Sequence, residues 1–121
     1  MESSMDIELS PEDQAFREEV IAFIRAELSP ATQRRITLGQ WFTREDEIGW
    51  ERQLGAKGWR ASNWTREEGG PGFTAMQKFI VWITCGEMGC RTISPFGPKM
   101  VGPVINRFGT PEQKARHIPG I

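Results

Sequence analysis

The 121-residue chain contains no tyrosine, one histidine and two cysteines, and its 15 basic residues nearly balance its 16 acidic ones. Both signs are interspersed along the sequence without a basic run or an acidic tail, so the charge pattern gives no reason to propose nucleic acid as a partner. The uncharged apolar stretch at residues 79–86 is far shorter than the ~20 residues of a transmembrane helix. Residues 1–10 lack the pattern of a signal peptide. We therefore expect a cytoplasmic protein that does not enter a membrane.

The cysteines, the histidine and the acidic residues are not arranged in a pattern typical of a catalytic or metal-binding site. Cys85 and Cys90 match no zinc or redox spacing and are expected to be buried free thiols. His117 lies at the end of a predicted helix, where a positive side chain favours the helix dipole. Three acidic clusters sit among other charges and are expected to be solvated: Glu18-Glu19, Glu45-Asp46-Glu47 and Glu67-Glu68. The residues alone predict no catalytic residue and no metal site.

Helix signals are abundant. Ser10 and Pro11 begin a first helix, and apolar residues then recur at helical spacing until Leu28-Ser29-Pro30 ends it. Thr43 and Asp46 resemble a capping box that starts a second helix, which ends at Gly58. Residues 31–42 between them show no sustained period and are predicted to be a polar excursion. Residues 59–73 contain the cluster Gly69-Gly70-Pro71-Gly72, which lacks the order of a phosphate-binding loop and is predicted to be a structural turn.

The third helix is predicted over residues 74–89. Its centre, residues 79–83, is apolar on every side, which indicates a central helix buried all round with Trp82 in the core. Stacking on a flavin is a less favoured interpretation of the same side chains, Met76, Phe79, Ile80, Trp82 and Ile83. A fourth helix is expected from about Met100 to Phe108, and a fifth from Thr110-Pro111 to Pro119. The predicted fold is an all-α bundle of about five helices around one buried helix.

The order of four motifs resembles the amino-terminal domain of acyl-CoA dehydrogenases. Residues 9–17 (LSPEDQAFR) are similar to the first helix of that family, and residues 55–59 (GAKGW) to the turn that follows its second. Residues 64–72 (WTREEGGPG) resemble its glycine-rich loop, although Thr65 replaces a proline and Glu68 an aromatic residue. Residues 108–114 (FGTPEQK), followed by Pro119, closely match a further signature of the family. These motifs cover nearly the whole chain.

The resemblance implies a three-domain flavoenzyme in which residues 1–121 form the first domain, and the β-domain and carboxy-terminal helical domain are absent. Such an enzyme desaturates acyl-CoA thioesters, uses FAD, and passes electrons to an electron-transferring flavoprotein. The family's glutamate base and its main flavin contacts belong to the later domains, so we expect this segment alone to bind no FAD and to be inactive. We also expect it to form a homo-oligomer, because partner surfaces are missing.

The same resemblance places residues 96–101 beside the acyl tail. Phe96, Met100 and Val101 would then form one wall of the substrate pocket. Met100 and Val101 could equally be ordinary core residues, and the sequence leaves both interpretations open. A second class of function also stays open, namely a stand-alone, non-catalytic helical interaction module or subunit derived from this domain. The sequence does not specify the acyl substrate.

Overall fold

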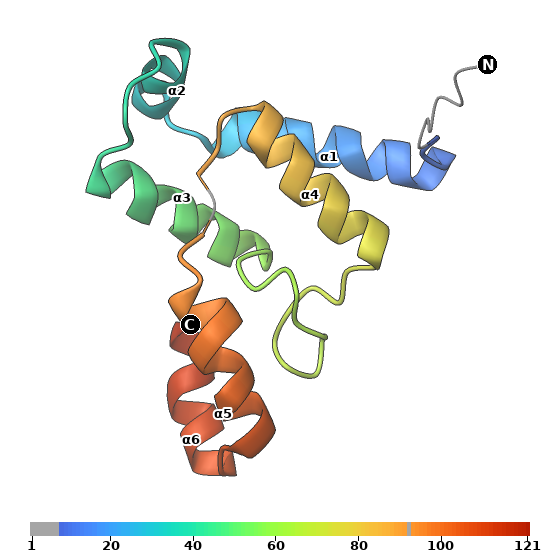
Figure 1. Cartoon of the computed structure of the whole chain (residues 1–121), viewed down its shortest axis with the longest axis vertical. Helices are drawn as coiled ribbons and strands as arrows, with labels where there is room; N and C mark the ends of the chain where they lie inside the picture. Colours follow the sequence, from blue (N-terminus) through green and yellow to red (C-terminus); the bar gives the residue numbers. More distant parts are fainter. Residues whose placement is uncertain (1–7, 92) are drawn as a thin grey trace, which may run out of the picture.

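The computed structural model describes residues 8–91 and 93–121, and within these it contains six α-helices, two short helical turns and no strand. Figure 1 shows α1, α3 and α4 gathered together, with α2 to one side and α5 and α6 projecting as a hairpin. The all-α prediction is confirmed. The elements are α1 (Pro11–Glu27), α2 (Pro30–Thr37), α3 (Arg44–Lys57), α4 (Ala75–Glu87), the π-helical η1 (Phe96–Val101), α5 (Gly102–Phe108), α6 (Pro111–His117) and the 3-10 turn η2 (Ile118–Gly120).

Local capping fixes most helix starts. The Ser10 hydroxyl accepts a hydrogen bond from the Asp13 backbone N–H at the start of α1. Complete capping boxes open α3, α4 and α6, each with a threonine at the N-cap: Thr43, Thr74 and Thr110. Gly58 ends α3 in the left-handed conformation, with φ 81°. Because these contacts lie within one turn, the sequence identifies them without any knowledge of the tertiary fold.

The helix α2 was missed by the sequence reasoning, which predicted residues 31–42 to be irregular. Ser29 caps it and Pro30 occupies its first turn, which repeats the pattern that opens α1. The Ser29-Pro30 pair both follows the end of α1 and begins α2, and only the first of these roles is predicted from the sequence. The eight residues of α2 carry little apolar material, so no hydrophobic period marks them.

The main core lies where α1 crosses α4 and rests against α3. Val20 and Ile24 of α1 and Ile80 of α4 are almost completely buried, together with Trp50 and Leu54 of α3. A group of aromatic rings extends this core, with centroids 5.1–5.8 Å apart: Phe16, Phe23, Trp50, Trp59 and Phe73. The apolar stripe predicted for α1 is therefore confirmed as its buried face.

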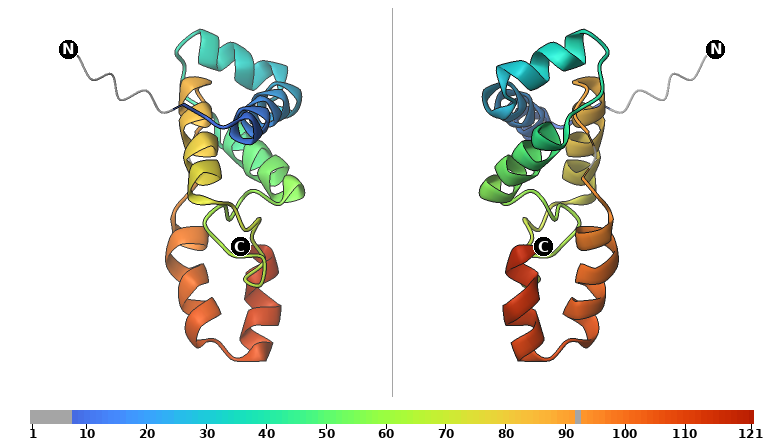
Figure 2. Two further views of the ribbon diagram at one scale, coloured as in Figure 1. Left: turned by 90° about the vertical axis from the view of Figure 1, so that its right-hand side faces the viewer. Right: turned by 90° about the vertical axis from the view of Figure 1, so that its left-hand side faces the viewer.

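The prediction that α4 is buried on every side is wrong. Its face toward α1 is covered, and Ile80 is 1% exposed, but Trp82 is 62% exposed and Phe79 is also open to solvent. The two views in Figure 2 show α4 at the side of the helical group rather than at its centre. An apolar run indicates that each face can be covered. Among the described residues, however, α4 packs closely against one helix, α1, and its other faces stay open.

Asp46 corrects the expectation that the acidic cluster at residues 45–47 is wholly solvated. Its carboxylate is buried and accepts hydrogen bonds from Thr32 and Arg35 of α2, each at 2.7 Å. It also accepts from the Thr43 backbone N–H at 2.8 Å and from the Thr43 hydroxyl at 2.9 Å. One side chain therefore caps α3 and fixes α2 to it. The spacing of Thr43 and Asp46 in the sequence predicted the cap of α3. It did not predict the contacts with Thr32 and Arg35, which lie on another helix.

The loop of residues 59–73 holds the start of the hairpin. Trp64 is buried and donates its indole N–H to the Pro98 carbonyl oxygen in η1 at 2.7 Å. A side chain on Gly70 or Gly102 would collide with Trp64, so glycine permits this close packing. The structural-turn interpretation of the glycine cluster is thus confirmed. The chain end returns to the same region, where Ile121 lies beside Gly97 (Figure 2).

Candidate functional site

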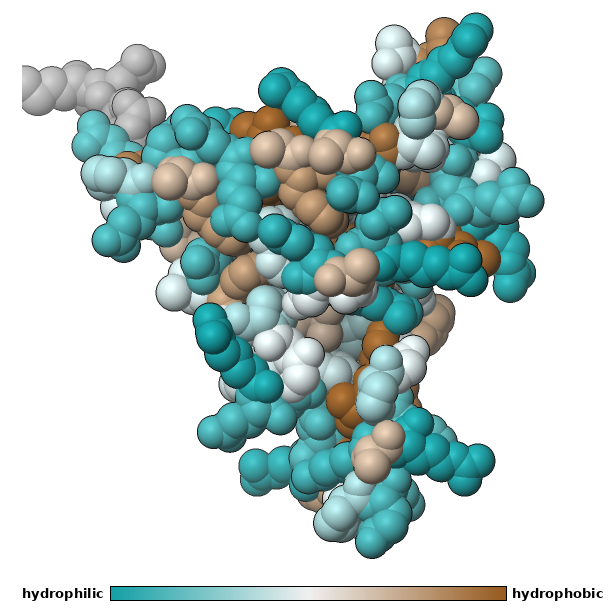
Figure 3. Space-filling view, turned by 180° about the vertical axis from the view of Figure 1, so that it is seen from behind, coloured by the Kyte–Doolittle hydropathy of each residue, from teal (hydrophilic) through white to brown (hydrophobic). Residues whose placement is uncertain are grey.

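An apolar surface forms where η1 passes into α5. Phe96, Met100 and Val101 are 70%, 56% and 47% exposed. The π-helical turn η1 is a departure from regular helix of a kind that often occurs at functional sites. Val104 and Phe108 of α5 continue the exposed apolar series along the hairpin. In Figure 3, brown apolar side chains interrupt the mainly hydrophilic surface toward the narrow end of the molecule.

These exposures bear on the interpretation of Met100 and Val101 as ordinary core residues. Met100 and Val101 are not core residues here, because about half of each side chain is open to solvent. Apolar residues that are exposed together on neighbouring turns usually mark a surface that another molecule or domain covers. We refer to Phe96, Met100, Val101, Val104 and Phe108 as the hairpin patch.

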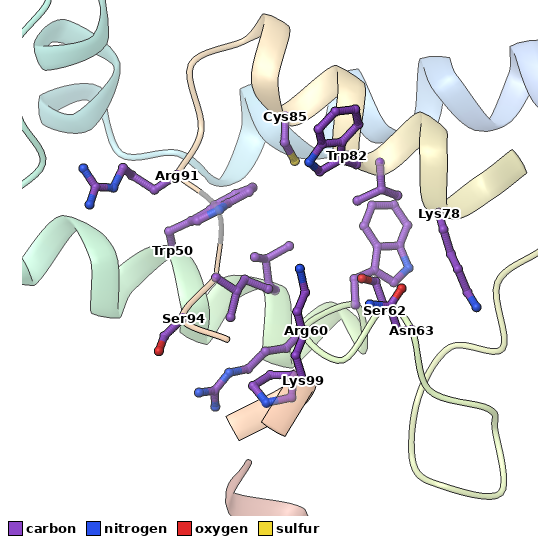
Figure 4. A pocket seen from close by; sticks show the side chains of 15 residues that line it. Trp50, Arg60, Ser62, Asn63, Lys78, Trp82, Cys85, Arg91, Ser94 and Lys99 are labelled. Atoms are coloured by element: carbon purple, nitrogen blue, oxygen red, sulfur yellow. The ribbon is translucent and has the colours of Figure 1, made fainter. Parts of the chain in front are cut away.

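A cleft opens between α3, α4 and η1, with a volume of about 100 Å³. Its walls are largely aromatic and aliphatic, and they come from α3, the following loop, α4 and the segment before η1. Figure 4 shows Trp50 on one side, Trp82 and Cys85 on the α4 side, and Arg60 and Lys99 at the base. Its apolar lining comprises Trp50, Leu54, Trp59, Val81, Trp82, Cys85, Ile93 and Pro98.

The charged residues that line this cleft are all basic: Arg60, Lys78, Arg91 and Lys99. Arg91 is committed to other partners, since it pairs with Glu47 at 3.2 Å and lies over the Trp41 ring at 5.7 Å. Arg60 pairs with Glu51 at 3.2 Å. Lys78 and Lys99 form no ion pair within the described part of the chain.

Cys85 and Cys90 are both free, but only Cys90 is buried, whereas Cys85 is half-buried and lines the cleft. The Cys90 backbone N–H donates to the Cys85 carbonyl oxygen at 2.9 Å across the end of α4. A hydrogen bond from the Cys90 thiol lowers the pKa of Cys85, while that same bond and burial raise the pKa of Cys90. The expectation of two buried thiols therefore holds for one of them.

In the part of the chain that the structure describes, no group of three or more acid, thiol or histidine side chains is placed to hold a metal ion. His117 lies in the last turn of α6, as predicted, and is exposed. None of the helices seen in residues 8–91 and 93–121 combines the length and the apolar character needed to cross a bilayer. What the sequence reasoning missed is the cleft. Trp50 and Lys99 come from segments 49 residues apart, and no spacing rule relates them.

Comparisons with known proteins agree with the motifs. The family model described as "Acyl-CoA dehydrogenase, N-terminal domain" matches residues 10–121. The acyl-CoA dehydrogenase IpdE1 of Mycobacterium tuberculosis is 30% identical over 78 residues, which cover 64% of this chain and 20% of that protein. The acyl-CoA dehydrogenase FadE26 of the same organism is 28% identical over 120 residues, covering 97% of this chain and 30% of that protein.

A solved structure shares the fold. The crystal structure of the ChsE4–ChsE5 complex from Mycobacterium tuberculosis superposes with a TM-score of 0.72 and 28% identity, covering 95% of this chain and 28% of that chain. The present chain therefore spans less than a third of the length of the curated relatives and the solved chain described here.

Proposed function

Since this chain belongs to the acyl-CoA dehydrogenase family and corresponds to its N-terminal domain, we propose that it is the first domain of an FAD-dependent enzyme. The proposed reaction is the α,β-desaturation of an acyl-CoA thioester, with an electron-transferring flavoprotein as electron acceptor and the cytoplasm as the compartment. The observation that carries the proposal is the match over residues 10–121, supported by two relatives named acyl-CoA dehydrogenases. These names favour an enzyme domain over a stand-alone interaction module.

The role that we propose for this domain is to supply one wall of the acyl pocket. Phe96, Met100 and Val101 are apolar, exposed and adjacent on η1, as a surface against an alkyl or ring-bearing tail requires. Their contribution is binding and exclusion of water. Close apolar contact with the tail positions the thioester for reaction, and a dry pocket strengthens the polar interactions that stabilise charge at its carbonyl oxygen.

FAD does not fit the cleft of this chain. The cleft has a volume of about 100 Å³, whereas pockets for drug-sized ligands occupy about 300–1,000 Å³ and FAD is larger than most such ligands. A second hollow of about 630 Å³ lies beside Trp64 and Arg107, so the family resemblance, and not cavity size, is our reason for placing the flavin contacts and the catalytic base in the parts of the parent enzyme beyond these residues. This segment alone is expected to bind no FAD and to have no dehydrogenase activity.

The experiment that tests the pocket wall replaces Met100 in the parent enzyme. Met100→Trp should reduce kcat/KM for long acyl-CoA substrates about tenfold, because the larger ring fills space that the tail needs, and should leave short substrates nearly unchanged. Leu38→Trp is the matched control, since Leu38 is an exposed residue at the end of α2. Equal kcat/KM values for long substrates in wild type and Met100→Trp would exclude Met100 from the wall.

A further inference from the structure

The end of α4 brings the two cysteines together. The Cys90 backbone N–H donates to the Cys85 carbonyl oxygen at 2.9 Å, and the Gly89 N–H donates to the Gly86 carbonyl oxygen at 3.2 Å. With Gly89 in the left-handed conformation, at φ 77°, these two bonds form a Schellman motif. In this motif the third residue before the C-cap and the second residue after it commonly hold their side chains in contact. Here both of those side chains are thiols.

The contact between the thiols leaves little distance for a covalent bond to close. The Cys90 thiol donates a hydrogen bond to Cys85, which lowers the pKa of Cys85. A disulfide needs Cα atoms about 4.4–6.8 Å apart, and two residues whose main chains share a direct hydrogen bond lie close to that separation. A bridge between Cys85 and Cys90 therefore requires rotation of the side chains and little movement of the backbone.

Only one of the two thiols is accessible from the surface. Cys85 is half-buried and lines the cleft between α3, α4 and η1. In Figure 4 its side chain extends from α4 toward the cleft, beside Trp82. Cys90 is 8% exposed and belongs to the core. A small molecule that reacts with thiols therefore meets Cys85 first, and Cys90 can act only from behind it.

The charges around the cleft favour an anionic reagent. The charged residues that line it are all basic, and Lys78 and Lys99 form no ion pair within the described part of the chain. Positive charge nearby favours a thiolate over a thiol and attracts anionic molecules. Oxidised glutathione is a small disulfide with net negative charge at neutral pH, so it suits both the accessible thiol and the basic lining.

We propose that Cys85 and Cys90 form a reversible dithiol–disulfide pair that small anionic disulfides oxidise. The Cys85 thiolate attacks one sulfur of oxidised glutathione, which forms a mixed disulfide at Cys85 and releases one glutathione thiolate. The Cys90 thiolate then attacks the Cys85 sulfur, which forms the Cys85–Cys90 bond and releases the second glutathione. The two protons of the protein thiols pass through water to the two released thiolates. Two protein thiols are thus oxidised and one glutathione disulfide is reduced.

The first step prepares the second. In the reduced chain the hydrogen bond to Cys85, burial and the charge of Cys85 all raise the pKa of Cys90. In the mixed disulfide the Cys85 charge is gone, so Cys90 ionises more readily and can attack. Because Cys90 begins the connection from α4 to η1, the bridge ties that connection to the end of α4. This inference uses only side chains of this chain and does not rest on the proposed dehydrogenase function.

The test incubates the reduced 121-residue chain with oxidised glutathione at neutral pH and stops the reaction with acid at timed points. Trypsin releases both cysteines in one peptide, residues 79–91, which mass spectrometry then analyses. We expect a main product lighter by about 2 Da, preceded by a transient glutathione adduct at Cys85. Dithiothreitol should restore both thiols. Cystamine, a cationic disulfide, should react about fivefold more slowly than oxidised glutathione, when each rate is divided by its rate with the urea-unfolded chain.

Matched single-thiol variants separate the two roles. Cys90→Ser should accumulate the glutathione adduct at Cys85, because the second thiol is gone. Cys85→Ser should form an adduct at Cys90 about tenfold more slowly, because Cys90 is buried. In urea both variants should react at similar rates, since the difference comes from the fold. If either variant fails to fold, as judged by circular dichroism, the time course of the wild type still decides, because it shows the order of adduct and bridge directly.

Four results would overturn the proposal. The first is no reaction, or a glutathione adduct in the wild type that persists without a bridge. The second is a disulfide between two chains instead of within one, as seen on a non-reducing gel. The third is an adduct at Cys90 that forms as fast as the adduct at Cys85. The fourth is an equal normalised rate for cystamine, which would remove the role of the basic lining. None of these results involves acyl-CoA or flavin, so this inference can fail independently of the proposed function.

Discussion

Asp46 stabilises two elements through one carboxylate. The backbone N–H of Thr43 and the hydroxyl of Thr32, with smaller contributions from Arg35 and the Thr43 hydroxyl, hold its pKa well below the ordinary value. All of these donors favour the ionised form and outweigh the opposite effect of burial. The negative charge is therefore part of the fold.

Asp46→Asn should lower the free energy of unfolding by about 2 kcal/mol at pH 7, because the amide cannot accept all of these hydrogen bonds. Since the folded pKa lies below the unfolded value of about 3.9, the stabilisation is complete above about pH 5 and is lost as the pH falls below that. Urea denaturation at several pH values measures this. Glu45→Gln, at an exposed neighbour, should change stability by less than about 0.5 kcal/mol. A wild-type advantage over Asp46→Asn that persists unchanged to pH 2 would contradict the assignment.

The two thiols should differ in reactivity. Cys85 is the more exposed and has the lowered pKa, so iodoacetamide should alkylate it about tenfold faster than Cys90. Peptide mass spectrometry after timed labelling gives both rates. Cys90→Ala removes the thiol that donates to Cys85, and Cys85 should then react more slowly at neutral pH. A faster reaction at Cys90 in the wild type would show that the direction of the hydrogen bond is wrong.

Within α4, neighbouring positions should respond very differently to truncation. Ile80→Ala should cost about 2–5 kcal/mol, because Ile80 packs against α1 and is almost fully buried. Trp82→Ala should cost less than about 1 kcal/mol in this chain, because most of the indole faces solvent or the open cleft. Chemical denaturation of both variants provides the comparison. A loss at Trp82 as large as that at Ile80 would restore the original view of a helix buried all round.

The helices also show how far the sequence determines the fold. The capping box of Thr43 and Asp46 and the Ser-Pro start of α1 use atoms within one turn, so the order of the residues predicts them. The boxes at Thr74 and Thr110 are equally local. Which side of α4 is exposed depends on the elements that pack beside it in the fold. A local sequence pattern does not specify those neighbours. The same holds for the cleft, since Trp50 and Lys99 meet only after the chain has folded. Phe96, Met100 and Val101 were selected by family resemblance, and the structure adds that they are exposed.

As a whole molecule, the isolated chain should self-associate through the hairpin patch. Covering a few hundred Å² of apolar surface contributes several kcal/mol at ~25 cal/mol per Å², part of which association entropy offsets. A net charge of −1 gives little repulsion between copies. Sedimentation velocity at micromolar concentration should show a dimer or a larger species. Phe96→Ser with Met100→Ser should shift the population toward monomer, whereas Leu38→Ser, at another exposed apolar residue, should not. A wild-type monomer across this range would remove the basis for a homo-oligomer.

The indole hydrogen bond from Trp64 to Pro98 has a consequence for local opening. The α5–α6 hairpin is built from contacts between segments close in the chain, whereas α1 and α4 are brought together across α2 and α3. Trp64 is a principal link between these two parts. Amide protons of α5 and α6 should therefore exchange with solvent through a partial opening that releases Trp64 and leaves the α1–α4 amides protected. The surface that we assign to the acyl tail thus belongs to the hairpin, which is expected to separate from the rest of the domain first. A bound tail or a neighbouring domain would slow the hydrogen exchange of the α5 and α6 amides.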